Sequence, residues 1–396
     1  MRYCVVILDG AAGWPLSQHC GRTSLQVAST PNLDRLAREG TMGLAQTVPE
    51  GTEPSSSAAC TSILGYDPVA AYVGRGAIEA ASMGITLGPD EVALRLNLVT
   101  LDGGVMTSYS AGHIPTDDSR ELVGEIAAAL DDDVFRLYPG VAYRHILVVK
   151  GHPELLECRY TPPHDISDKP VAEFMPAGDG TQVLLDYMER ARPIVAVSAV
   201  TARRRAASGV APSDVWPFWP GDAPGGLTPF GELRGVRGAM TSGVDLLNGL
   251  AVLFGLDRLA IDGVTDGPDT DYAAQAVGAL EALKTHDVVI VHVESPDEAG
   301  HAGDVDGKIA AIEAIDREVI SRVAEAAAER GDLRVLAMPD HPTPLELKTH
   351  VGEAVPFVLW GPGIGANGAD SYDESEAGGT GLMVDPGHGV MDLLLG

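Results

Sequence analysis

Apolar runs of strand length recur along the chain and alternate with segments of helical periodicity. The runs dominated by β-branched or other apolar residues are 3–10, 143–151, 192–200, 286–294, 333–341 and 355–363. Fully apolar runs are typical of parallel strands that are buried on both faces of a sheet. Strands that alternate with helices predict an α/β fold, in which a mostly parallel sheet has helices on both faces.

Two segments between these runs carry helix signals. Thr30 is an N-cap candidate, Pro31 suits the first helical position and Gly40 provides a stop, which together predict a helix from 30 to 40. Residues 308–329 repeat isoleucine and valine at helical spacing, which predicts a helix with one face in the core.

The segment 76–169 has a different pattern. An Asp-Gly-Gly turn signal separates two of its strand candidates, and Gly-rich and Pro-rich joints bound it. We predict that it forms a smaller α+β domain inserted into a larger domain made of 1–75 and 170–396.

The segment 202–242 is rich in glycine, proline and tryptophan, and it predicts a long loop excursion. Trp216, Phe218 and Trp219 are expected to be covered by the rest of the protein, because exposing them together would be costly in water.

Composition narrows the class of protein. The chain has 396 residues, of which 45% are hydrophobic, and this is enough for about two or three domains with a real core. No stretch reaches about 18 uninterrupted apolar residues and the first residues lack a signal-peptide pattern, so no membrane partner is expected. The cysteines Cys4, Cys20, Cys60 and Cys158 are scattered, which is typical of reduced thiols in the cytoplasm.

The formal net charge of −29 opposes binding to a phosphate backbone, so nucleic acid is not an expected partner. A small anionic substrate remains compatible with this charge, because a few arginines and metal ions build a local positive site. The oligomeric state stays open, with a homo-oligomer among the alternatives.

Three strand candidates each end in an acid: Asp9, Asp297 and Asp340. In open α/β sheets, ligands bind at the carboxyl ends of the strands. One such aspartate would be an ordinary turn residue. Three of them, two with histidines nearby, indicate a functional edge of the sheet.

The histidines have metal-ligand spacing. His301 follows Asp297 by four residues, His341 is adjacent to Asp340, and His350 comes shortly after. Mixed carboxylate and imidazole ligands suit Mn²⁺, Zn²⁺ or a related divalent ion. Two such ions about 4 Å apart would clamp a phosphoryl group and lower the pKa of a hydroxyl, which would activate a nearby serine.

The whole chain resembles a known family in its motifs. In chain order these are LDGAAGWP, TPNLDRLAREG, LGYDP, GRGAIEA, YSAGHI, YPGVAYRH, TPPHDI, VHVESPDEAGHAGD, PDHPTP and THVGEAVPF. They are similar to those of cofactor-independent (2,3-bisphosphoglycerate-independent) phosphoglycerate mutases of the archaeal type, a branch of the alkaline phosphatase superfamily. The resemblance implies an alkaline-phosphatase-like sheet with an inserted domain.

The resemblance also implies a ligand set for two divalent metal ions, Mn²⁺, Zn²⁺ or Mg²⁺. The residues implied for the first ion are Asp297, His301 and His350, and those for the second are Asp9, Asp340, His341 and the nucleophile Ser56. Ser56 is the candidate nucleophile because it stands at the expected distance before the LGYDP motif. Its neighbours Ser55 and Ser57 remain alternative candidates for the same role.

The implied reaction interconverts 3-phosphoglycerate and 2-phosphoglycerate through a phosphoserine, with the inserted domain closing over the small phosphorylated substrate. Carboxylate or phosphate contacts are expected from Arg75, His113, Arg144 and His164. Arginine suits this role because its planar fork matches both groups.

The chain departs from the family around the nucleophile. Ser55 replaces a glycine, Ser57 replaces an acid and Cys60 replaces a histidine or asparagine. Three alternatives therefore stay open: a homoserine kinase-like phosphotransferase of the same family, a metal-dependent phosphomonoesterase, and a metal-binding protein without catalysis.

Overall fold

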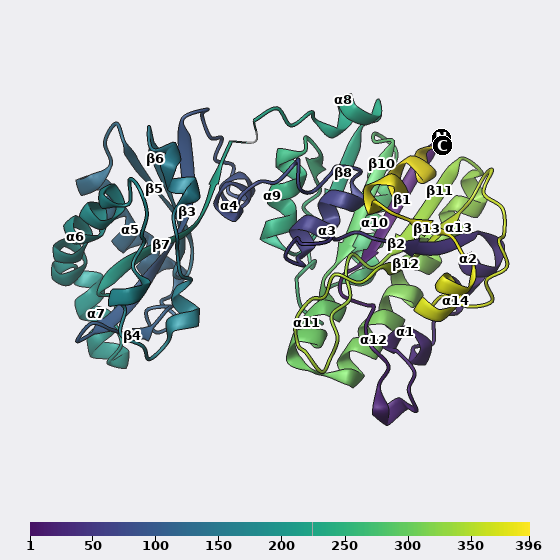
Figure 1. Ribbon diagram of the computed structural model, residues 1–396, viewed down its shortest axis with the longest axis horizontal. Helices are drawn as coiled ribbons and strands as arrows, with labels where there is room; N and C mark the ends of the chain where they lie inside the picture. Colours follow the sequence, from purple (N-terminus) through teal and green to yellow (C-terminus); the bar gives the residue numbers. More distant parts are fainter. Residues whose placement is uncertain (224) are drawn as a thin grey trace. The chain divides into compact units, whose positions relative to one another are not determined.

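The computed structural model describes residues 1–223 and 225–396. The chain divides into two compact units: Met1–Tyr72 together with Gly226–Gly396, and Val73–Gly225 (Figure 1). Among the described residues, none of the helices has the length and apolar character needed to cross a bilayer.

The first unit contains an eight-stranded sheet. In spatial order its strands are β13 (Met383–Val384), β2 (Thr41–Ala45), β12 (Val355–Trp360), β11 (Leu333–Met338), β1 (Arg2–Leu8), β10 (Val288–Val293), β8 (Gly238–Thr241) and β9 (Asp257–Arg258). Only β12 pairs antiparallel to its neighbours. The predicted α/β fold with a mostly parallel sheet is confirmed.

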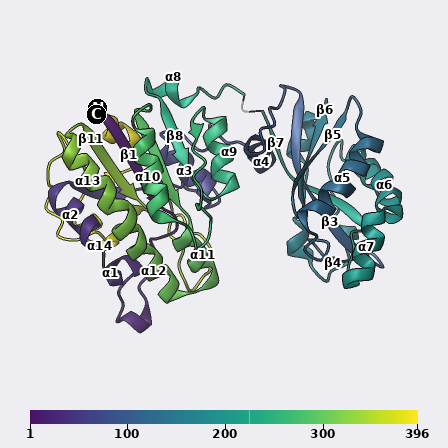
Figure 2. The same ribbon diagram turned by 180° about the vertical axis from the view of Figure 1, so that it is seen from behind.

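Helices lie on both faces of this sheet, and α10 and α13 stand in front of the strands in Figure 2. The α-helices of the first unit are α1 (Ser24–Val27), α2 (Pro31–Glu39), α3 (Ser56–Ile63), α8 (Phe230–Arg234), α9 (Asp245–Leu253), α10 (Tyr272–Ala282), α11 (Ser295–Ala302), α12 (Val305–Ile315), α13 (Ser321–Arg330), α14 (Glu374–Gly379) and α15 (Val390–Leu395). Shorter turns are η1 (Ser17–His19), η5 (Asp316–Ile320) and η6 (Gly387–Gly389).

Both helix predictions are confirmed. The first corresponds to α2, with Thr30 before it and Pro31 at its start. The second comprises α12 and α13, joined by the π-helical turn η5. Asp316 in that turn is buried and accepts a hydrogen bond from the Leu33 backbone N–H at 2.7 Å, which ties the long helical segment to the first turn of α2.

The register of the central strands explains where a site forms. In β1, Leu8 pairs with Val293 of β10 and Ile7 pairs with Met338 of β11. The three strands are parallel, so the residues that follow them leave the sheet at the same edge. This edge carries the acids recognised in the sequence.

The second unit is built on a five-stranded antiparallel sheet. Its strands are β3 (Glu91–Asp102), β4 (Val105–Ser108), β5 (Phe135–Val141), β6 (Arg144–Lys150) and β7 (Asp214–Asp222), with β3 paired to both β6 and β7. Its helices are α4 (Arg75–Ser82), α5 (Thr116–Leu130), α6 (Gln182–Val197) and α7 (Ala199–Ser208), with short turns η2 (Pro153–Glu157), η3 (Pro163–Ile166) and η4 (Ala172–Phe174).

The predicted end of the inserted domain at residue 169 is wrong. The unit continues to Gly225, because β7 pairs with β3 along its length and α6 packs into the same core. Trp216 and Phe218 are fully buried in β7 and Trp219 is partly buried, so their predicted burial is correct. The long loop predicted at 202–242 is wrong, because this segment holds the end of α7, β7, α8 and β8.

The strand predicted at 192–200 is also wrong, because these residues end α6 and begin α7. Leu184, Met188, Ala191 and Val195 are buried at helical spacing, so one face of α6 is apolar and packs on the sheet. The runs at 143–151 and 355–363 do form strands, but β6 and β12 are antiparallel rather than parallel.

Candidate functional site

The edge of the large sheet holds Asp9 and Asp340, both fully buried just beyond the ends of β1 and β11. Gly10 follows Asp9 with φ +61, a conformation that favours glycine. Its backbone N–H donates to Asp340 Oδ1 at 3.1 Å. The turn after β1 therefore fixes the two carboxylates side by side.

A first cluster consists of Asp297 and His301 in α11 and His350 in the loop before β12. His301 Nε2 lies 3.0 Å from Asp297 Oδ2 and 2.9 Å from His350 Nε2, and His350 Nε2 lies 3.5 Å from the same carboxylate oxygen. Three ligand atoms thus converge on one point.

The outer nitrogens of both histidines face backbone carbonyl oxygens. His301 Nδ1 lies 3.0 Å from the Lys348 oxygen and His350 Nδ1 lies 3.3 Å from the Pro54 oxygen. Each Nδ1–H therefore donates outward, and each Nε2 lone pair points into the cluster. This is the usual arrangement of metal-binding histidines, so the cluster fits a divalent cation.

The charges of this cluster are coupled. Burial pushes the pKa of Asp297 upward, but hydrogen bonds from His301 and His350 outweigh burial and hold that pKa well below its usual range. The Asp297 carboxylate raises the pKa of His301 to about 9. Burial alone would lower the pKa of His350. The hydrogen bond and the charge of Asp297 outweigh burial, so the pKa of His350 is raised overall. A cation bound here would replace the protons that these histidines share with Asp297.

A second cluster surrounds His341, which is completely buried. Its Nε2 lies 3.2 Å from Ser56 Oγ, 3.3 Å from Asp340 Oδ2 and 3.6 Å from Asp9 Oδ1. Its Nδ1 lies 3.3 Å from Thr343 Oγ1, and the Thr343 hydroxyl also donates to Asp297. Thr343 therefore links the two clusters.

The second cluster carries an excess of negative charge. Burial raises the pKa of Asp9 well above its usual value, and the Asp340 and Asp297 carboxylates raise it further. Burial lowers the pKa of His341, which keeps the imidazole neutral and able to accept a cation. Buried carboxylates, a neutral imidazole and a hydroxyl form a donor set that fits a second divalent cation.

Only Ser56 of the serine triplet contacts His341 among the described residues. It is the first residue of α3, so its Oγ sits at the positive end of the helix dipole. Ser55 is the N-cap: its Oγ accepts from the Ala58 N–H at 3.3 Å. With φ −159 its backbone is extended, so this turn does not require the glycine found in the family.

His292 and Glu294 also lie at this site, although the sequence patterns did not single them out. His292 Nε2 lies 2.7 Å from Asp9 Oδ2. Burial and the neighbouring Asp9 raise the pKa of Glu294 to about 11, so its carboxyl is protonated near neutral pH. The signal was a histidine inside the apolar stretch 288–293 and an acid directly after it, within the run 286–294 that was interpreted only as a strand.

Lys308 is a further buried charge near the clusters. Its ammonium group donates to the carbonyl oxygens of Ala12 at 3.1 Å and Thr343 at 2.7 Å. Burial lowers its pKa to about 8. Lys308 therefore cross-links the loops that follow β1 and β11.

The four predicted substrate-binding residues lie in the second unit, where aromatic rings surround them. The Arg75 guanidinium stacks 3.9 Å from the Trp219 ring, and the His164 ring lies 5.7 Å from the same ring. The centre of the His113 ring lies 6.4 Å from the centre of the Tyr143 ring. The Arg144 guanidinium lies 5.8 Å from the centre of the same ring.

A buried ion pair supports this basic and aromatic cluster. Arg95 is 7% exposed and its Nη1 lies 2.5 Å from Glu79 Oε2. The other oxygen of Glu79 accepts from Arg75 Nε at 3.0 Å. Glu79 thus holds two guanidinium groups in place, and the cluster is suited to a small anion.

Comparison with known proteins shows similarity along the whole chain. A family model described as 2,3-bisphosphoglycerate-independent phosphoglycerate mutase matches residues 37–200. A protein of that name from Methanothrix thermoacetophila is 44% identical, and the match covers 100% of both chains. Another from Methanosarcina barkeri is 40% identical over 97% of both chains.

Two solved structures are similar over 100% of this chain. A Pyrococcus horikoshii protein is 26% identical with a TM-score of 0.83, and 96% of it is covered. A cofactor-independent phosphoglycerate mutase from Thermoplasma acidophilum is 28% identical with a TM-score of 0.71, and 98% of it is covered.

Proposed function

Since the chain belongs to the 2,3-bisphosphoglycerate-independent phosphoglycerate mutase family, we propose that it interconverts 3-phosphoglycerate and 2-phosphoglycerate through a phosphoserine at Ser56. The observation that carries this proposal is the position of Ser56 Oγ, 3.2 Å from His341 Nε2 at the start of α3. A hydroxyl at a helix N-terminus beside a cluster of metal-ligand type is suited to accept a phosphoryl group.

The proposed mechanism uses two divalent cations, Mn²⁺, Zn²⁺ or Mg²⁺. The residues that would hold the first are Asp297, His301 and His350, and those that would hold the second are Asp9, Asp340, His341 and Ser56. When bound, the cations supply positive charge that favours the alkoxide form of a serine and offsets the charge of the transferring phosphoryl group.

Ser56 would act twice. In the first step a bond forms between Ser56 Oγ and phosphorus while the bond from phosphorus to the 3-oxygen of the substrate breaks, and that oxygen takes up a proton. In the second step the 2-oxygen forms a bond to phosphorus and gives up its proton, while the bond from phosphorus to Ser56 Oγ breaks and Ser56 regains a proton. The N–H groups at the start of α3 favour the negative charge of the phosphoryl group in both steps.

The second unit would hold the rest of the substrate. We assign carboxylate or phosphate contacts to Arg75 and Arg144, whose planar forks match both anions. His113 and His164 are assigned polar contacts in the same cluster. Burial and the nearby arginines lower the pKa of His164, so this ring is neutral at physiological pH and serves as a hydrogen-bonding group rather than a charge.

The test is conversion of 3-phosphoglycerate followed by phosphorus NMR, with Mn²⁺ and without added 2,3-bisphosphoglycerate. We expect 2-phosphoglycerate to form, the reaction to stop on chelation, and Ser56→Ala to abolish it. Ser57→Ala is the matched control, because Ser57 is the neighbouring residue and its side chain bonds to Ser55 rather than to His341. This control is expected to stay active.

Other products would identify the remaining alternatives. Release of inorganic phosphate would indicate a phosphomonoesterase, and formation of phosphohomoserine from ATP and homoserine would indicate a kinase-like enzyme. Full mutase activity in Ser56→Ala would overturn the assignment of the nucleophile. A protein that binds cations but converts none of these substrates would be a metal-binding protein without the proposed chemistry.

A further inference from the structure

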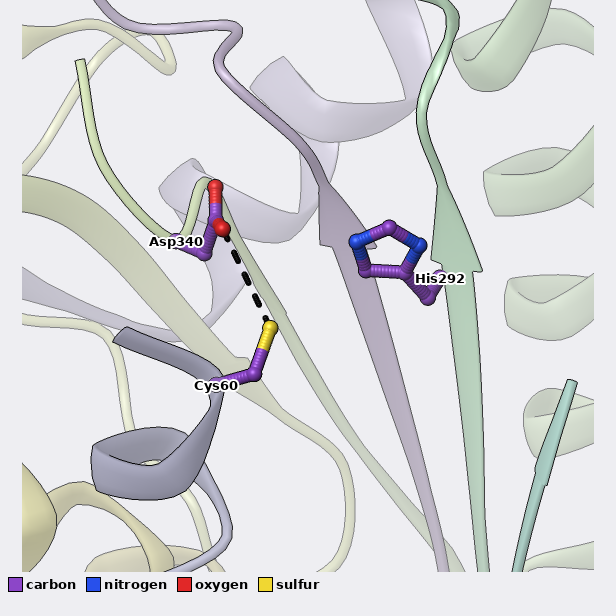
Figure 3. Close-up of side chains that lie close together, drawn as sticks. All are labelled: Cys60, His292 and Asp340. Atoms are coloured by element: carbon purple, nitrogen blue, oxygen red, sulfur yellow. Dashed lines mark hydrogen bonds between the residues drawn. The ribbon is translucent and has the colours of Figure 1, made fainter. Parts of the chain in front are cut away.

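A thiol completes a third group of donors beside the two clusters. Cys60 in α3, His292 in β10 and Asp340 after β11 are all buried, and one donor atom of each lies within 4.8 Å of the others. Cys60 Sγ lies 3.8 Å from Asp340 Oδ2. Figure 3 shows the Cys60 sulfur pointing toward the Asp340 carboxylate. Three separate elements thus bring a sulfur, a nitrogen and an oxygen donor together.

The His292 ring is held in place by contacts on both of its nitrogens. Its Nδ1 lies 3.0 Å from Ser242 Oγ, and its backbone carbonyl accepts from Gln275 Nε2 at 2.9 Å. These bonds fix the ring so that Nε2 faces Asp9 Oδ2 at 2.7 Å. When one nitrogen of a histidine binds a metal, the other nitrogen is usually hydrogen-bonded, which fixes the orientation of the ring.

Two acids next to His292, Asp9 and Glu294, each have one buried carboxyl oxygen without a hydrogen-bond partner among the described residues. Asp9 is fully buried and its Oδ1 has no hydrogen-bond partner among the described residues, and the same holds for Glu294 Oε2. A buried carboxylate oxygen without a partner costs roughly 1–3 kcal/mol or more. Positive charge beside His292 would offset this cost at Glu294 Oε2, which lies 3.7 Å from His292 Nε2, whereas Asp9 Oδ1 lies 3.6 Å from His341 Nε2 and faces the second cluster.

We propose that Cys60, His292 and Asp340 form a third cation site that takes a thiophilic divalent ion of the Zn²⁺ class. Thiolate, imidazole and carboxylate together are the ligands of Zn²⁺, whereas Mg²⁺ takes oxygen ligands. On binding, a bond forms between Cys60 sulfur and the ion, and the thiol proton passes to solvent. Asp340 is shared with the second cluster.

The sulfur donor of this site stands in the segment where the chain departs from the motif that the family resemblance implies. Cys60 stands where the family resemblance expects histidine or asparagine, so the sulfur donor is a feature of this sequence. The inference goes beyond the proposed mutase activity and does not need turnover to be tested. Loss of the third site and loss of the mutase reaction are therefore separate results.

The test is a cobalt titration of the chelated full-length protein, kept reduced with a phosphine rather than a thiol. We expect a sulfur-to-cobalt charge-transfer band in the near ultraviolet and three bound ions per chain. Cys60→Ala should lose the band and one ion. Cys4→Ala is the matched control, because Cys4 is equally buried in the same unit but lies in β1 away from the donors, and it should keep both.

A second variant tests the orientation of His292. Ser242→Ala keeps all three donors and removes the bond to Nδ1, so cobalt affinity measured at the charge-transfer band should fall about 10-fold or more. Should Cys60→Ala fail to fold, Cys60→Ser removes the sulfur with a smaller change of volume. X-ray absorption of the zinc-loaded wild type gives a check without variants, with a Zn–S distance of about 2.3 Å expected.

Two results would overturn the proposal. One is a cobalt-loaded wild type without the charge-transfer band, or zinc-loaded protein without a sulfur neighbour. The other is a band that survives in a folded Cys60 variant. Conversion of 3-phosphoglycerate by a protein that lacks the band would refute the third site and leave the mutase proposal intact.

Discussion

His301 Nε2 and His350 Nε2 lie 2.9 Å apart, although 49 residues separate them along the chain. Each ring donates its Nδ1–H to a backbone carbonyl, so both Nε2 atoms face each other beside the Asp297 carboxylate. Two nitrogen lone pairs at this distance repel unless a proton or a cation lies between them. The pair therefore fits the cation site that we propose for this cluster, and backbone carbonyls hold both rings in place.

Removal of one of these rings should weaken cation binding. A cation at 100 times its Kd stabilises the folded state by about 2.7 kcal/mol per site. We expect the rise in Tm on adding Mn²⁺ to chelated protein to be smaller in His350→Gln than in wild type. His388→Gln, a histidine outside the clusters in η6, is the control and should respond like wild type. Equal responses of all three proteins would contradict the assignment.

Gly10 should be intolerant of a side chain. Its φ is +61, and a Cβ there would lie closer than 3 Å to atoms of Asp297 and Thr343. Gly21 also has positive φ, but a Cβ there meets nothing within 4 Å. In urea unfolding, Gly21→Ala should cost about 1–2 kcal/mol for the backbone alone. Gly10→Ala should cost roughly 1–3 kcal/mol more, because the clash adds to the backbone term.

Gly10→Ala should also weaken cation affinity, because relief of the clash moves the Asp297 carboxylate. Two glycine variants with equal stability and equal Mn²⁺ affinity would show that the turn after β1 has room to adjust.

Lys308 should make stability depend on pH in the alkaline range. Burial lowers its pKa from 10.5 to about 8, so the folded protein releases this proton at a lower pH than the unfolded chain does. The cost of burying the charge is fully present below pH 8 and disappears as pH rises toward 10.5. The free energy of unfolding should therefore gain roughly 3 kcal/mol from this group across that window.

The measurement compares urea unfolding of wild type and Lys308→Met from pH 7 to 10. The difference between the two proteins isolates Lys308 from tyrosines and other groups that titrate in the same range. At pH 7 the variant also leaves the Ala12 and Thr343 carbonyls without their donor, at about 1–3 kcal/mol each. Parallel pH profiles would show that Lys308 stays protonated.

Arg75 should contribute to substrate affinity through its planar shape. Its guanidinium stacks on Trp219 and bonds to Glu79, and lysine reproduces the charge without the stacking or the fork. Arg75→Lys should lower kcat/KM for 3-phosphoglycerate roughly tenfold or more, as expected for loss of a charge-assisted bond. The control is Arg203→Lys, an exposed arginine of the same unit that pairs with Asp118. Unchanged kinetics in Arg75→Lys would leave Arg75 as a structural residue.

The pattern of the sequence was sufficient for the fold class and for naming most of the residues that the structure brings together at the edge of the large sheet. Most of the apolar runs form buried strands, and the ends of two of them locate Asp9 and Asp340, because parallel strands deliver their carboxyl ends to one edge. The family resemblance is confirmed by relatives that match the whole chain. The motifs also indicated Ser56, which the structure places against His341.

Pairing between distant segments was not visible in the sequence. The inserted unit ends at Gly225 because β7 joins β3, more than 100 residues earlier, and such pairing leaves no local signal. The run at 192–200 is apolar enough for a strand, but the face of α6 that carries Val195 is buried against the sheet of the second unit. Tertiary packing therefore overrides local propensity there.

Residue types and their order along the chain determined the chemistry of this protein: acids at strand ends, histidines beside them and a serine before a helix. The tertiary structure alone decided which atoms meet. His292 faces Asp9, and Cys60 faces Asp340, because neighbouring strands and one turn of α3 aim these side chains into the same buried space. Burial sets the charge of each group only after the chain has folded, because removing water raises the pKa of acids such as Glu294 and lowers that of Lys308.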